Sequence, residues 1–198
     1  MPSFAQELRR DSARPSRWML SEIAGRLVEI SSSGASVSLT MVFALVREAQ
    51  ERGEPVGWVT AMNSFFYPPD AAQGGVDLAA LVVVRVLHPT SIPRAAEKLL
   101  RSGGFGLIVL DLEAADIPMP LQSRLTGLAQ HHHAALICLT EKESRTFSLG
   151  SLVSLRVHAE RKRSDSSRFL CRLCVLKDKR RGPTWTHEEF YRGPAGLC

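Results

Sequence analysis

Short, continuous apolar runs rich in β-branched residues constrain the fold of this chain more than any other feature. Three of them are Leu81–Leu87, Leu107–Leu110 and Ala134–Leu139, and strand-like segments at Gly25–Ile30 and Val56–Thr60 precede them. Runs of this length are typical of strands that are covered on both faces, as in a parallel sheet. The pattern therefore predicts a central sheet whose strands are mostly parallel.

Helical patterns lie between these runs. The spacing of apolar residues predicts helices over Ser38–Arg52, Ile92–Ser102 and Leu121–His131. The pair Gly103-Gly104 is a strong stop signal for the second of them. Strands that alternate with helices predict an α/β fold with right-handed crossovers and helices on both faces of the sheet.

The pattern changes after about residue 150. Two adjacent strand-like segments, residues 151–160 and 168–177, predict an antiparallel hairpin at the edge of the sheet. The segment Phe65–Asp77 and the stretch after Lys179 have the composition of loops. We therefore divide the chain into an N-terminal arm or helix (1–24), a core domain (25–179) and a basic, aromatic C-terminal tail (180–198).

Composition limits the class of protein. The 198 residues suffice for one domain of ordinary size, and no apolar run is long enough to cross a bilayer. The first residues lack an apolar stretch of the signal-peptide type, so we expect a cytoplasmic protein that does not contact membranes. Cys171 and Cys174 point to opposite faces of a predicted strand, which favours reduced thiols over a metal site.

The positive charge of the chain is concentrated near its C-terminal end. The net charge is +5, and residues 156–192 hold eleven Lys and Arg against five Asp and Glu. Such an excess indicates an acidic partner, either nucleic acid or an acidic protein surface, but a solvated hairpin rim explains it equally well.

The segment Gly25–Val46 has the setting of a phosphate-binding loop: an apolar strand, a loop of small residues and an apolar-periodic helix. It contains no lysine and only one loop glycine, Gly34. The frame of a phosphate site is therefore present without the groups that hold phosphate.

With these motifs in order, the chain resembles the ATPase core of the RecA recombinase over roughly residues 25 to 190. The resemblance rests on "GRLVEI", "VGWVTA", "GVDLAALVVV", "LLRSGGFGLIVLDL" and "RLCVLKDKRRGP". Among RecA relatives it is most similar to the ImuA family, through "LVVVRVLHPTSIPRAAEKLLRSGGFGLIVLDL", "KDKRRGP" and the closing "RGPAGL". The cell-division inhibitor SulA is a more distant relative with the same core.

The resemblance implies a degenerate nucleotide loop. Ser32 stands at the first glycine of the RecA motif, Val37 at the second, Ser38 at the lysine and Leu39 at the hydroxyl that binds magnesium. A serine carries no charge for the phosphates, a β-branched side chain obstructs the close approach of phosphate, and a leucine cannot ligate Mg²⁺.

The remaining RecA positions are changed as well. Met62 occupies the place of the catalytic glutamate, and Glu141 lies at or beside the glutamine that senses the γ-phosphate. Asp111 alone matches, as a relic of the acid that holds magnesium. The resemblance therefore implies no ATP hydrolysis and no nucleotide or metal cofactor.

The ImuA resemblance implies a non-catalytic adaptor in DNA-damage-induced (SOS) mutagenesis. Its expected partners are an ImuB-type polymerase scaffold, RecA itself and an error-prone replicative polymerase, together with weak, non-specific DNA binding. The residues that we expect at a partner contact are Lys177, Lys179, Arg180, Arg181 and Trp185. Two alternatives remain open: a residual ATP-binding recombination mediator and a SulA-like inhibitor of cell division.

Overall fold

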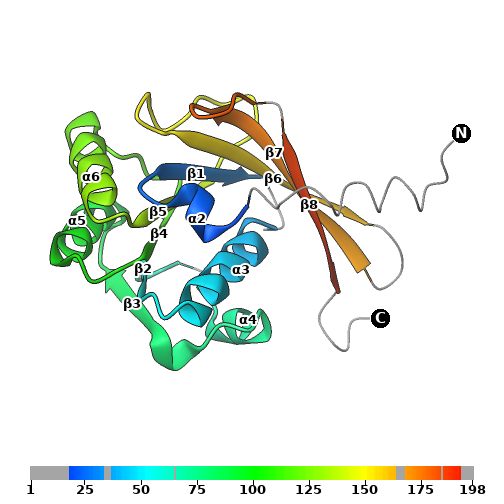
Figure 1. Cartoon of the computed structure of the whole chain (residues 1–198), viewed down its shortest axis with the longest axis horizontal. Coiled ribbons are helices and arrows are strands. Elements are labelled where there is room, and N and C mark those ends of the chain that lie inside the picture. The colour runs from blue at the N-terminus through cyan, green and yellow to red at the C-terminus, as the bar shows by residue number, and fades with distance from the viewer. Residues whose placement is uncertain (1–17, 34–36, 65, 164–167, 184, 193–198) are drawn as a thin grey trace, which may run out of the picture.

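A computed structural model describes residues 18–33, 37–64, 66–163, 168–183 and 185–192. Its helices and strands form one α/β unit around a single sheet (Figure 1). In chain order the elements are α2 (Leu20–Ile23), β1 (Leu27–Ser32), α3 (Val37–Glu51), β2 (Val56–Ala61), α4 (Pro68–Gln73), η1 (Leu78–Ala80), β3 (Leu81–Val86), η2 (Pro89–Ser91), α5 (Ile92–Ser102), β4 (Leu107–Glu113), α6 (Met119–His131), β5 (Ala135–Glu141), β6 (Leu155–Arg163), β7 (Arg168–Asp178) and β8 (Thr186–Arg192).

The sheet has eight strands in the order β3-β2-β4-β5-β1-β6-β7-β8. Strands β1 to β6 pair in parallel, whereas β7 pairs antiparallel with both β6 and β8. The predicted α/β class, the mostly parallel sheet and the antiparallel C-terminal hairpin are therefore confirmed. The three last strands extend beyond the helices as a ribbon, seen in yellow to red in Figure 1.

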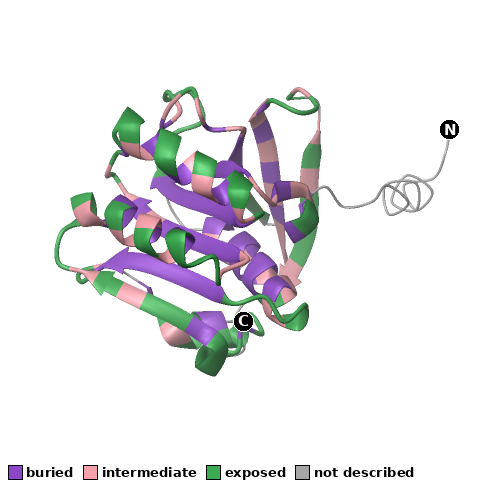
Figure 2. Ribbon diagram, turned by 60° about the vertical axis from the view of Figure 1, so that its left-hand side comes forward, coloured by how far each residue is buried: buried purple, intermediate pink, exposed green. Residues whose placement is uncertain are grey.

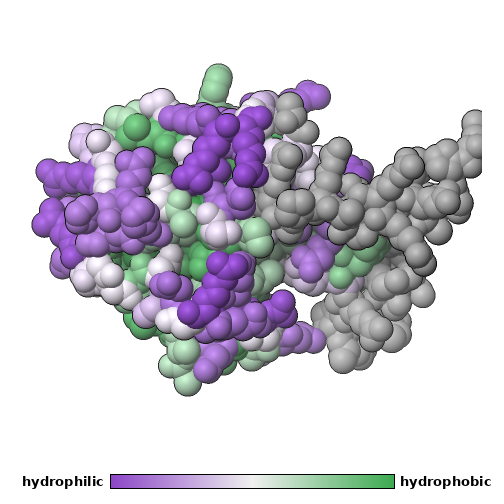
Figure 3. Space-filling view, in the orientation of Figure 1, coloured by the Kyte–Doolittle hydropathy of each residue, from purple (hydrophilic) through white to green (hydrophobic). Residues whose placement is uncertain are grey.

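Two apolar layers cover the sheet. One cluster packs α2 and α3 against one face, and a second packs α5 and α6 against the other. The central strands β1, β2, β4 and β5 are buried almost along their whole length, while α5 and α6 are buried on their inner sides only (Figure 2). Hydrophilic side chains accordingly gather over α5 and α6 on the surface (Figure 3). This amphipathic pattern explains why the periodicity of the sequence predicted the helices correctly.

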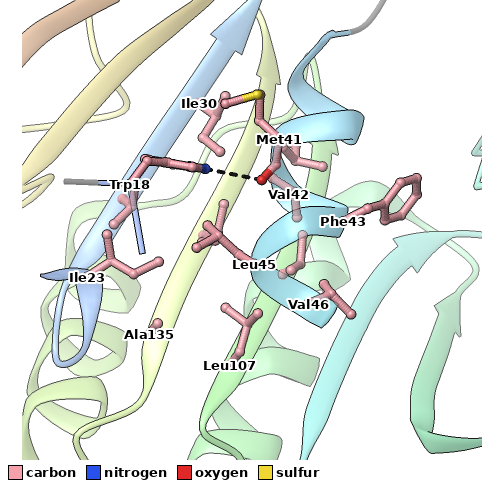
Figure 4. Packing of buried hydrophobic residues seen from close by; sticks show 14 of the residues in the cluster. Trp18, Ile23, Ile30, Met41, Val42, Phe43, Leu45, Val46, Leu107 and Ala135 are labelled. Carbon is pink, nitrogen blue, oxygen red and sulfur yellow. Dashed lines mark hydrogen bonds between the residues drawn. The ribbon is translucent and has the colours of Figure 1, made fainter. Parts of the chain in front are cut away.

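The first described residues belong to the core. The Trp18 side chain is buried, and its indole N–H donates to the backbone carbonyl of Met41 on α3 over 3.1 Å. Figure 4 places this contact beside Ile30 of β1 and Ile23 of α2. This hydrogen bond satisfies the buried indole N–H and ties the start of the described chain to α3.

Three local expectations are corrected by the structure. Strand β3 is not covered on both faces, because it lies at the edge of the sheet and leaves Val82 45% and Val83 36% exposed. Helix α4 falls within Phe65–Asp77, where we expected only loop, and strand β8 falls in the stretch after Lys179. No helix in the described part of the chain combines the length and apolarity that crossing a bilayer requires.

Candidate functional site

A cleft opens where the parallel strands end. The chain leaves β1 toward the face that α3 covers and leaves β4 toward the face that α6 covers. Open α/β sheets bind ligands at such a divergence, outside the carboxyl ends of the strands. The cavity has a volume of about 210 Å³ and is lined by Ser32, Ser38, Leu39, Ser64, Phe66, Asp111, Glu113, Leu139, Thr140 and Glu141.

The structure brings three of the four nucleotide-loop positions into this cleft. Ser32 at the end of β1 and Ser38 in the first turn of α3 place their hydroxyl oxygens 3.2 Å apart. Leu39 also lines the cavity. Val37, the first residue of α3, does not, because its side chain is buried in the apolar cluster between α3 and the sheet. Residues 34–36, which complete the loop, lie outside the described residues. The strand-to-helix connection is retained, with two serines facing each other across it.

Acidic side chains form the opposite wall. Asp111 of β4 accepts hydrogen bonds from Thr60 (3.0 Å) and Ser64 (2.5 Å). Glu113 follows it at a register shift in β4 and has a φ of 53°, in the left-handed region that side chains rarely adopt. Glu141 ends β5. Three carboxylates therefore surround a space in which a phosphate site would need cations.

The three carboxylates act on one another. Burial raises the pKa of Glu113, and the negative charges of Asp111 and Glu141 raise it further, although the nearby Ser64 hydroxyl opposes this shift. Burial is the largest cause of this shift, and the like charges of Asp111 and Glu141 add to it because they disfavour the ionised carboxylate. Among the described residues that line the cavity, none is a lysine or an arginine.

Met62 lies just beyond β2 and is 50% exposed, but it is not part of the cavity wall. The sequence reasoning did not identify Ser64 and Thr140, which line the cleft because they follow or end strands that terminate there. A search for polar residues directly after apolar runs would have found Thr140, which follows Leu139, but not Ser64, which lies three residues beyond the end of β2.

The residues expected at a partner contact lie far from this cleft, at the amino ends of the parallel strands. Arg180 donates to the backbone carbonyls of Glu22 (3.3 Å) and Ala24 (3.5 Å), and Arg181 forms a 2.9 Å ion pair with Glu22. Lys177 donates to two backbone carbonyls of the β5–β6 connection at 3.3 and 3.4 Å, and Lys179 is exposed. Arg180 and Arg181 therefore join the segment after β7 to α2 and Ala24, and Lys177 joins β7 to the β5–β6 connection.

A buried ion pair that the sequence reasoning missed lies beneath this group. Arg26 and Asp178 meet at 2.7 Å with side chains that are 4% and 1% exposed. Trp185 donates its indole N–H to the same carboxylate at 3.1 Å. Burial raises the pKa of Asp178, but hydrogen bonds from the Arg180 backbone and from the Arg26 and Trp185 side chains outweigh it, so the net pKa is lowered. The carboxylate is therefore held in its ionised form.

A second buried carboxylate, Glu29 of β1, fixes the β5–β6 connection. It accepts hydrogen bonds from the Ser148 hydroxyl at 2.7 Å and the Leu149 backbone N–H at 3.0 Å. Lys142 and Arg156 supply positive charge at 3.6 and 3.8 Å. A fully buried carboxylate is stable only with such compensation, so this cluster fixes the connection to the sheet.

Cys171 and Cys174 both lie on strand β7. Cys171 is buried and Cys174 is partly exposed, and both are free thiols. Burial raises the pKa of each, which keeps them protonated at neutral pH. Within the ranges that the structure describes, no three His, Cys, Asp or Glu residues are grouped as metal ligands would be.

The chain is similar to RecA proteins over about half of its length. It is 32% identical to Protein RecA of Fusobacterium nucleatum, 33% to that of Thermotoga petrophila and 30% to that of Rickettsia massiliae, each over 94 residues. These matches cover 48% of this chain and 25%, 26% and 27% of the respective relatives, so it spans about a quarter of their length. No known family model matches the chain.

The architecture and the partial similarity agree. The mostly parallel sheet with its antiparallel extension is consistent with a RecA-like core, and 94 matched residues are too many for a shared motif alone. The chain therefore has a distant RecA-like relationship.

Proposed function

We propose that this chain is a non-catalytic, RecA-like adaptor in DNA-damage-induced mutagenesis. One observation carries the proposal: the cleft at the carboxyl ends of the strands is lined by Asp111, Glu113 and Glu141 and by no lysine or arginine among the described residues. The RecA-like relationship supports a role in DNA repair or recombination. The assignment to mutagenesis rests on the resemblance to the ImuA family.

Electrostatics argue against nucleotide binding at this cleft. A triphosphate needs backbone N–H groups, a lysine and a metal ion to offset its negative charge. Here Ser38 replaces the lysine, Leu39 replaces the metal-binding hydroxyl, and Glu141 adds negative charge to the wall. Repulsion between carboxylates and phosphates in a partly enclosed cavity disfavours binding before any catalytic group is considered.

The partners that we propose are an ImuB-type polymerase scaffold, RecA and an error-prone replicative polymerase. The basic C-terminal segment supports electrostatic attraction to an acidic partner, because Lys179, Arg180 and Arg181 remain exposed despite their internal contacts. The same positive charge supports weak binding to DNA of any sequence.

Two measurements test the proposal. Deleting the gene in its native host should lower the frequency of mutation after DNA damage without lowering survival in undamaged cells. The purified chain should also co-elute with the ImuB-type scaffold in size-exclusion chromatography. An unchanged mutation frequency together with filamentation on overexpression would favour a SulA-like role, and ATP-dependent loading of RecA onto DNA would favour a recombination mediator.

A further inference from the structure

Phe147 is the most exposed of the large apolar side chains in the described part of the chain, at 91%. It lies in the β5–β6 connection, beyond the carboxyl end of β5. Isolated apolar residues on a surface are common and need no explanation. Phe147 differs because the backbone next to it is held in place by buried groups.

The buried carboxylate of Glu29 holds the residues next to Phe147. Ser148 donates its hydroxyl to Glu29 at 2.7 Å, and the Leu149 backbone N–H donates to the same oxygen at 3.0 Å. Before Phe147, the Thr146 N–H donates to the Glu143 carbonyl at 3.1 Å and closes a turn. A side chain presented on a pinned loop loses little conformational entropy when a partner binds it.

A second exposed apolar side chain lies on a segment joined to this loop. Met119 begins α6 and is 49% exposed. Gln122, one helical turn later, is buried and donates to the carbonyls of Leu149 at 2.8 Å and Ile117 at 2.7 Å. One amide therefore connects the loop that carries Phe147 to the start of the helix that carries Met119.

The connections at these two side chains, counted with the strand ends before them, hold more acids than cations. The two connections after β4 and β5, with the strand ends, carry the acids Asp111, Glu113, Asp116, Glu141 and Glu143. No salt bridge involves any of the five within the described ranges. Of the two cations in the β5–β6 connection before Phe147, Lys142 is turned inward to Glu29, which leaves Arg145 exposed.

We propose that Phe147 and Met119 form the apolar centre of a docking surface for a basic, apolar-rich segment of a partner protein. The inference rests on the proposed adaptor role and adds the surface and the chemistry of the partner. Exposed apolar residues supply the buried area, and the unpaired carboxylates select a partner of positive charge. The same carboxylates disfavour nucleic acid here, since they repel its phosphates.

The probe for this surface is a fluorescent peptide of about 16 residues, long enough for four helical turns, made of leucine and lysine in an amphipathic pattern. Its binding is measured by anisotropy at low and high salt. Phe147→Ala should weaken binding at least about tenfold, as expected for a central aromatic contact. Phe190→Ala is the matched control, because Phe190 is 51% exposed on β8, and it should change binding less than about twofold.

Thermal melts of both variants should match the wild-type protein, because neither side chain is buried. A peptide with glutamate in place of lysine should not bind. The proposal is wrong if Phe147→Ala binds the lysine peptide as the wild type does, if both variants lose binding equally, or if a single-stranded oligonucleotide binds through Phe147 instead.

Measuring how the ImuB-type scaffold binds the wild type and the Phe147→Ala variant tests the docking surface and the proposed function separately. If the scaffold binds the wild type and Phe147→Ala equally well, the surface is wrong and the adaptor role stands. If the scaffold does not bind the wild type, whereas the lysine peptide binds in a Phe147-dependent manner, the surface stands and that partner is wrong.

Discussion

The two ends of the parallel strands use charge in opposite ways. At the amino ends, Arg26 and Asp178 form a buried pair that Trp185 completes. At the carboxyl ends, Asp111 and Glu113 lie together in an open cleft with no cation in its described wall. The buried pair at the first end joins the C-terminal ribbon to the core. The second leaves charge uncompensated, which a fold tolerates only where water or a partner can reach it.

The position of positive charge in the sequence does not by itself distinguish a structural contact from a binding surface, whereas the contacts in the folded chain do. The basic segment after β7 has the composition of a binding surface, yet Arg180 and Arg181 contact Glu22 and its neighbours within the same chain. The acidic cleft has no internal partner of opposite charge in the described residues. The contacts at the amino end therefore contribute to stability besides any partner contact, and the docking surface that we propose lies at the carboxyl end.

The largest expected effect is at the amino end. Arg26→Met leaves the carboxylate of Asp178 buried without its cation, so we expect the free energy of unfolding to fall by about 3–5 kcal/mol. Arg181→Ala is the control, because its ion pair with Glu22 is exposed and contributes less than about 1 kcal/mol. Urea denaturation of both variants checks this. Equal losses would mean that burial of the pair is not what matters.

A smaller loss is expected at Trp185. Trp185→Phe keeps most of the aromatic surface but removes the indole N–H that donates to Asp178. A hydrogen bond to a charged group contributes about 1.5–3 kcal/mol, and the partial exposure of Trp185 places the loss at the lower end. The measurement is again urea denaturation. A variant as stable as the wild type would show that Arg26 alone neutralises Asp178.

Much of the fold follows from local sequence, and the exceptions have physical reasons. Helix α5 has the predicted bounds, since Gly103 ends it with a φ of 68° that glycine adopts without strain. Strand β8 was not predicted, because "THEEFYR" is mostly polar and becomes a strand by pairing with β7. The exposure of β3 depends on its place at the edge of the sheet, which no local pattern encodes.

Some residues of the two charged regions could be expected from the sequence, and others could not. Ser32, Ser38, Leu39 and Asp111 were expected at one site because the resemblance to RecA implies it, and all four line the same cavity. The pairing of Arg26 with Asp178 joins residues 152 positions apart, so only the folded chain reveals it. That pairing is also why the basic segment serves as a structural junction in addition to any contact with a partner.

At the carboxyl end the expected change in stability is small and opposite in sign. Glu113 has a raised pKa, so its contribution to stability is present below the unfolded-state pKa and is lost as pH rises through the folded-state value. Glutamine cannot ionise, so the Glu113→Gln variant lacks the unfavourable, partly buried charge that the wild type carries at pH 7. We expect its free energy of unfolding at pH 7 to exceed that of the wild type by less than about 0.5 kcal/mol, because solvent screens the site.

Melting curves between pH 4 and pH 8 test this change. The difference between Glu113→Gln and the wild type should widen as pH rises. A difference that narrows with rising pH would indicate that the favourable effect of the Ser64 hydroxyl on the ionised carboxylate outweighs burial and the repulsion from Asp111 and Glu141.

The central claim is that the cleft at the carboxyl ends repels the phosphates which the RecA-like frame would otherwise hold. Isothermal titration calorimetry with ATP and Mg²⁺ tests it most directly, with a RecA protein as the positive control. The account predicts no binding heat for this chain at sub-millimolar nucleotide. Saturable binding at micromolar ATP, abolished by a bulky substitution at Ser38, would contradict it.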